Sequence, residues 1–69
     1  MLFDTATVGQ MTAYIERMDV DHIILSKADL YTLINRMLLL NDRFSNPTTK
    51  ERFDKIIVFY HSHYMKGRV

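Results

Sequence analysis

Two histidines one residue apart, His61 and His63, lie in the stretch FYHSHY and are the first candidates for metal binding or acid–base chemistry. If this stretch is helical, each residue is rotated by about 100° from the one before it, so the two imidazoles point to opposite flanks. Helical metal sites instead place two histidines four residues apart. A histidine near the end of a helix also interacts favourably with the helix dipole. We therefore expect both histidines to have a structural role.

The stretch DVDH offers a second cluster of metal-binding residue types, Asp19, Asp21 and His22. It lacks the glycine and the distal glutamate of a calcium-binding EF-hand loop, so we interpret it as a polar turn. The chain has no cysteine and no Gly-x-Ser-x-Gly motif, and its two glycines form no phosphate-binding motif. We predict no catalytic residue, no metal site and no cofactor, and we expect that the protein is not an enzyme.

The histidine pair belongs to the helix that the sequence predicts most clearly. Asn46 is suited to cap a helix whose first residue is Pro47, and Gly67 is suited to end it after Lys66. The apolar residues between these limits repeat at helical spacing and predict one buried stripe: Phe53, Ile56, Ile57, Tyr60 and Tyr64. His61 and His63 fall at the margins of this stripe.

Two further helices precede it. Ser26, followed by Asp29 at capping-box spacing, predicts the start of a second helix, and Thr7 with Gln10 predicts the start of a first one. The core face of the second helix comprises Leu30, Leu33, Ile34, Met37, Leu40, Asn41 and Phe44. The first helix has a stripe of Val8, Met11, Tyr14, Ile15 and Met18, interrupted by Gly9 at a cost of about 1 kcal/mol.

The predicted fold is therefore all-α. It is a small three-helix domain that occupies residues 1–69, with helices at about 7–18, 27–44 and 47–66. Residues 22–25, which are mostly β-branched or apolar and too few for a helix, predict a short extended segment before the second helix. A chain of 69 residues has room for one domain only, and self-association helps a core of this size to be stable.

Composition narrows the class of protein. Hydrophobic residues make up 48% of the chain and charged residues 25%, as in ordinary globular proteins. The longest apolar runs are far shorter than the roughly 18 residues that suggest a membrane span, and the first ten residues lack the pattern of a signal peptide. We therefore expect a cytoplasmic protein that has no membrane contact.

The net charge of +1 is unevenly distributed. Residues 1–35 hold five acidic and two basic residues, which gives −3, and residues 36–69 hold seven basic and three acidic residues, which gives +4. One interpretation is that the two halves attract each other, within the fold or across a dimer. The other is that the basic half presents a face to an acidic partner.

Some apolar residues are more than one small core needs, and they predict a protein interface. Leu39 lies near the back of the second helix, with Tyr31 and Leu38 on its flank. Asn41 lies within the core face of that helix, where a buried asparagine can either pair with its symmetry mate or bind a backbone carbonyl at the helix end. We predict partner or dimer contacts at Tyr31, Leu38, Leu39, Asn41, Val58, Phe59 and Met65.

Basic residues on outward faces support a different function, the binding of nucleic acid. The candidates are Arg36, Arg43, Arg52, Lys55 and Lys66. The order of an extended segment followed by two helices also resembles that of ribbon-helix-helix dimers, whose paired strands enter the DNA major groove. The segment HIILSK offers few side chains that read bases, however, and acidic residues lie near the basic arc.

We expect a small non-enzymatic regulator or inhibitor that binds another protein, in the size range of those that viruses and mobile elements encode. The second helix is the predicted site of self-association into a homodimer. Phe59 is interpreted as pointing away from the buried stripe and towards a partner. A dimeric DNA-binding regulator is the alternative, and the sequence does not identify the partner.

Overall fold

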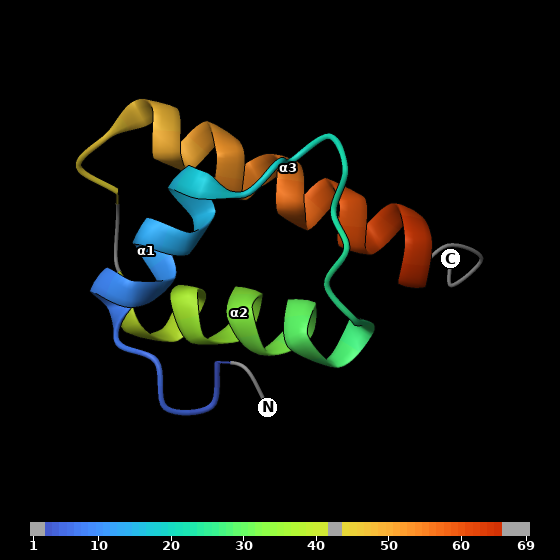
Figure 1. The fold of residues 1–69 in the computed structure, drawn as a ribbon, viewed down its shortest axis with the longest axis horizontal. Coiled ribbons are helices and arrows are strands. Elements are labelled where there is room, and N and C mark those ends of the chain that lie inside the picture. The colour runs from blue at the N-terminus through green and yellow to red at the C-terminus, as the bar shows by residue number, and fades with distance from the viewer. Residues whose placement is uncertain (1–2, 42–43, 66–69) are drawn as a thin grey trace.

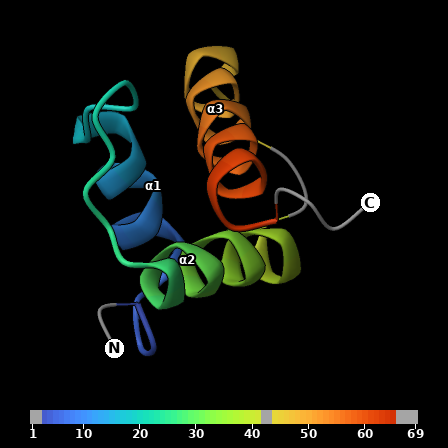
Figure 2. The same cartoon turned by 90° about the vertical axis from the view of Figure 1, so that its right-hand side faces the viewer.

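A computed structural model describes residues 3–41 and 44–65, which form three helices (Figure 1). These are α1 (Val8–Arg17), α2 (Lys27–Leu40) and α3 (Pro47–Tyr64). The prediction of an all-α fold is confirmed, and the described residues contain no β-strand. In Figure 2, α1 and α3 lie next to each other above α2, and each helix contacts the other two.

Side chains at the helix starts form the caps that the sequence predicts. Thr7 accepts a hydrogen bond from the backbone N–H of Gln10 at 3.1 Å, and the Gln10 side chain accepts one from the N–H of Thr7 at 2.9 Å, which completes a capping box. Ser26 accepts from the N–H of Asp29 at 3.2 Å. Asn46 accepts from the N–H of Thr48 at 2.9 Å, with Pro47 in the first turn.

The second helix ends earlier than predicted. Its last residue is Leu40, and the cap residue Asn41 has extended backbone angles (φ −128°, ψ 106°), so the predicted end at Phe44 is wrong. Phe44 still contacts the core, because its ring lies 5.3 Å from the ring of Phe53 on α3. Leu40, which was predicted to lie on the core face, is 53% exposed.

Eight apolar side chains form the core between the helices: Phe3, Met11, Ile15, Leu30, Leu33, Met37, Phe53 and Ile56. Seven of them belong to the predicted stripes. Phe3 comes from the segment before α1 and packs edge-on against the ring of Tyr14, with 5.2 Å between ring centres. The hydroxyl of the buried Thr49 on α3 donates a hydrogen bond to Glu16 on α1 at 2.9 Å.

Two arginines hold the chain segments on these helices. Arg36 on α2 donates a hydrogen bond to the carbonyl oxygen of Ala6 at 2.6 Å and so fixes the segment before α1. Arg52 on α3 donates to the carbonyl oxygen of Ile15 at 2.8 Å and to that of Met18. These carbonyls lie at the C-terminal end of α1, where the helix itself leaves oxygen atoms without partners. Among the described residues, no helix is long and apolar enough to cross a membrane.

Candidate protein-binding surfaces

The outward-facing part of α2 is apolar. Tyr31 and Leu38 lie two turns apart on one face, Leu39 follows about 100° further round, and all three are exposed. We call these three residues the outer α2 surface. Leu39 is 78% exposed, and Leu40 extends the apolar area at the helix end.

This part of α2 also lacks free charge. Arg36 is the one charged residue between Leu30 and Leu40, and its guanidinium is bonded to the carbonyl oxygen of Ala6. Thr32 directs its hydroxyl to the carbonyl oxygen of Ala28 at 2.9 Å. An exposed helix face without charged side chains is unusual for a surface in contact with water, and it is typical of the centre of a protein interface.

The other predicted interface residues are more dispersed. Val58 is exposed on α3, Met65 is partly buried directly after α3, and Asn41 is the partly buried C-cap of α2. The interpretation of Phe59 as turned away from the core is wrong. Its side chain packs against the core, and its ring stacks on that of His63 with 4.0 Å between ring centres.

The predicted basic residues do not form one surface in the described structure. Arg36 and Arg52 are partly buried and donate to backbone carbonyls. Lys55 is exposed and makes no hydrogen bond or ion pair with another described residue. Arg43 and Lys66 lie outside the described residues, so Lys55 is the one candidate of the five that is seen to be free for a phosphate group.

The histidines lie as the helix geometry predicts. His61 and His63 are both exposed on α3, and the Nδ1 atom of His63 lies 3.2 Å from the carbonyl oxygen of Phe59. The DVDH stretch is confirmed as a turn, because Asp19 accepts the N–H of Asp21 at its side chain and the N–H of His22 at its carbonyl. Residues 3–41 and 44–65 contain no group of three or more His, Asp or Glu residues that could hold a metal ion.

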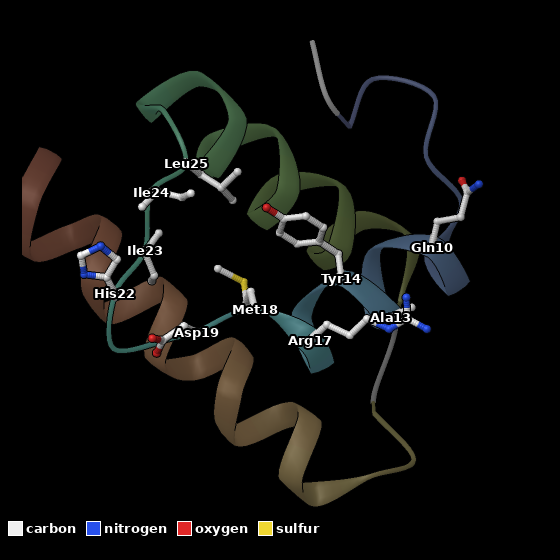
Figure 3. A pocket seen from close by; sticks show the side chains of 10 residues that line it. All are labelled: Gln10, Ala13, Tyr14, Arg17, Met18, Asp19, His22, Ile23, Ile24 and Leu25. Carbon is white, nitrogen blue, oxygen red and sulfur yellow. The ribbon is translucent and has the colours of Figure 1, made fainter.

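A groove of about 650 Å³ lies between α1 and the segment that connects α1 to α2 (Figure 3). Tyr14 and Met18 line it from the α1 side, and Ile23 and Leu25 line it from the connecting segment. Arg17 and Asp19 lie at its rim. Reasoning from the sequence missed this groove, because it forms only where the connecting segment runs beside α1.

The segment itself is the second exposed apolar feature of the chain. Ile24 is 82% exposed, the largest exposed fraction among the large hydrophobic side chains in the described ranges. Residues 23–26 have no assigned secondary structure, so the predicted extended segment is present as coil and not as part of a sheet.

No family model, no curated protein and no solved structure matches this chain. The function must therefore be inferred from the surfaces themselves. Two apolar surfaces stand out, one on α2 and one on the segment before it.

Proposed function

We propose that this chain is a small non-enzymatic protein that regulates or inhibits another protein by binding it, and that it acts as a homodimer. The observation that carries the proposal is the outer α2 surface. Tyr31, Leu38 and Leu39 are exposed on a helix whose one nearby charged side chain is bonded elsewhere.

Burial of this surface would stabilise a complex. A fully buried leucine side chain contributes about 1.5–3 kcal/mol relative to an exposed one, and Leu38 and Leu39 are both mostly exposed in the single chain. The tyrosine ring adds a large, rigid contact, and its centre already lies 6.4 Å from that of Tyr60. Aromatic residues are enriched at the contacts that dominate binding energy.

The protein-binding proposal has more support than the nucleic-acid alternative. Binding to phosphate groups needs several free cations, and each one contributes to a steep dependence on salt. Arg36 and Arg52 already donate to carbonyl oxygens within the chain. Among the predicted basic residues that the structure describes, Lys55 is the one that is exposed.

A homodimer fits the size of the core. A chain of 69 residues buries a smaller fraction of its surface than a larger domain does, so self-association adds stability that the single chain lacks. The sequence predicts self-association through the second helix. The exposed segment that connects α1 to α2 is better suited to pair with a second copy of the chain. We therefore assign the outer α2 surface to the protein that the homodimer regulates. We propose a cytoplasmic location for the homodimer. We include regulators encoded by viruses and mobile elements among the candidate classes for this protein.

The test compares three versions of the protein as baits for proteins from the cells that produce it: wild type, Leu39→Asp, and Thr48→Asp as the control. The control adds the same charge at an exposed position at the start of α3. A protein that wild type and control both retain is then purified, and its dissociation constant is measured. We expect Leu39→Asp to weaken binding at least thirtyfold, since interface hot spots contribute 2 kcal/mol or more. Equal binding by both variants would remove the outer α2 surface from the proposal.

A further inference from the structure

Residues 23–26 lie between the turn at residues 19–22 and the start of α2, and they have no assigned secondary structure. Ile23, Ile24 and Leu25 all line the groove beside α1, but Ile23 and Leu25 are partly buried and pack against the core, whereas Ile24 between them is 82% exposed (Figure 3). Side chains on an extended chain alternate between two faces in this way. The segment therefore packs Ile23 and Leu25 against the protein and leaves most of the Ile24 side chain uncovered by the described chain.

The backbone of this segment is also unpaired. The N–H and C=O groups of Ile23, Ile24 and Leu25 make no hydrogen bond with any described residue, whereas the neighbouring His22 N–H donates to Asp19 at 3.1 Å. An extended stretch with free N–H and C=O groups offers an edge on which another extended segment can form a β-ladder.

The sequence of the segment with its flanking residues, DHIILSK, is complementary to itself when one copy runs antiparallel to the other. With Ile24 opposite Ile24, Ile23 lies opposite Leu25 and His22 lies opposite Ser26. Just beyond each end of this pairing, the acidic Asp21 of one copy lies near the basic Lys27 of the other. Both charged residues are exposed; the Lys27 Nζ atom lies 6.0 Å from the centre of the Tyr64 ring, and neither residue makes an ion pair with another described residue.

We propose that two copies of this chain pair antiparallel through residues 22–26, with the two-fold axis beside Ile24. The inference rests on the proposed homodimer and specifies its interface. Pairing would cover Ile24 with its own copy, satisfy backbone groups on both chains, and add an Asp21–Lys27 pair at each end. Opposite charges at the ends of an interface add a small stabilisation, and a two-fold interface requires a surface that matches itself.

This arrangement leaves Leu38 and Leu39 of the outer α2 surface accessible. Leu38 and Leu39 lie in the last turn of α2, whereas the paired segment ends where α2 begins. A dimer of this kind therefore presents two outer α2 surfaces, one from each copy. A partner protein with two equivalent sites would gain from binding both at once.

Disulfide cross-linking tests the pairing directly, because the chain has no cysteine of its own. Residues opposite each other in antiparallel strands have Cα atoms about 4.5–5.5 Å apart, which is within the range that a disulfide spans. We expect the Ile24→Cys variant to form a covalent dimer under mild oxidation. The Leu39→Cys and Val58→Cys variants, whose positions are also exposed, should form no disulfide-linked dimer under the same conditions.

Charge exchange tests the register. Asp21→Lys or Lys27→Asp alone brings like charges near each other at both ends of the pairing, so each change should raise the dimer dissociation constant about tenfold. The double exchange should restore it to within about threefold of wild type. Circular dichroism verifies that each variant is folded, so that a change in mass can be assigned to the interface.

Two outcomes would overturn the inference, and they separate it from the proposed function. A wild-type chain that sediments as a monomer contradicts the homodimer itself. If the wild type is a dimer, but the Leu39→Cys variant cross-links and the Ile24→Cys variant does not, the homodimer stays in place and the pairing of residues 22–26 is refuted. Failure of the double charge exchange to restore the dimer would refute the register centred on Ile24.

Discussion

Replacement of Arg52 by methionine should destabilise the fold strongly. Methionine keeps much of the aliphatic stem but removes the donors that reach the carbonyl oxygens of Ile15 and Met18. Arg52 also places a positive charge at the C-terminal end of α1, where the helix dipole is negative. The variant therefore tests whether this side chain belongs to the fold or to a basic binding face.

The expected magnitude follows from the two hydrogen bonds. A hydrogen bond that involves a charged group contributes about 1.5–3 kcal/mol, and we take the lower value because the site is partly buried. Two such bonds give a loss of about 3 kcal/mol. A domain of this length has a free energy of unfolding of about 3–10 kcal/mol, so the loss is a large part of the total.

Urea unfolding followed by far-UV circular dichroism measures this loss. Lys55→Ala is the matched control, because Lys55 is an exposed basic residue three positions away on the same helix and should change stability by less than about 0.5 kcal/mol. Arg52→Lys should give an intermediate loss, since lysine cannot donate in the same forked geometry. If Arg52→Met unfolds at the same urea concentration as Lys55→Ala, Arg52 does not hold α1 and becomes available for an acidic partner.

Three further changes have defined expected outcomes. Gly9→Ala should raise the free energy of unfolding by about 0.5–1 kcal/mol, because Gly9 is helical and an added Cβ would meet no atom closer than the Thr7 hydroxyl at 3.9 Å; a lower thermal midpoint would contradict this. Thr49→Val should cost about 1–2 kcal/mol in urea unfolding, because it removes the hydroxyl that donates to Glu16 from a buried position, and an unchanged midpoint would show that this bond contributes nothing. Zinc should leave the thermal midpoint of the wild type within about a degree, whereas a site filled at 100 times its dissociation constant would add about 2.7 kcal/mol.

The helix starts could be predicted because their signals are local. A capping side chain and the N–H group that it binds are two or three residues apart, as with Thr7 and Gln10, so residue type and spacing are sufficient. The core stripes were predicted for a similar reason, since helical periodicity brings Leu30, Leu33 and Met37 to one side.

The end of α2 could not be predicted from periodicity alone. Phe44 continues the spacing of the stripe, but it lies beyond the end of α2, where its ring packs against that of Phe53. Asn41 is a sequence signal for the end of α2 that apolar periodicity does not take into account, because asparagine competes with the helix for backbone hydrogen bonds. Apolar spacing does not show whether the backbone between two matching residues stays helical.

The roles of the two arginines depend on contacts that no local pattern reveals. Arg36 and Ala6 are 30 residues apart, and Arg52 and Ile15 are 37 apart. A long side chain on the margin of a helix can either extend into solvent or reach a carbonyl oxygen on a neighbouring helix. A helical wheel shows the same position for the residue in both cases. For the same reason the groove beside residues 23–25 became visible only once α1 and the connecting segment were placed together.

Sedimentation equilibrium of the wild-type chain at tens of micromolar tests the central claim most directly. The claim is that the exposed apolar surfaces of this protein are covered by other protein chains, beginning with a second copy of itself. The account predicts a mass of twice the 8.2 kDa of one chain, and a return to the mass of one chain in the Ile24→Asp variant. A wild type that sediments as a single chain over this range of concentrations would contradict the claim.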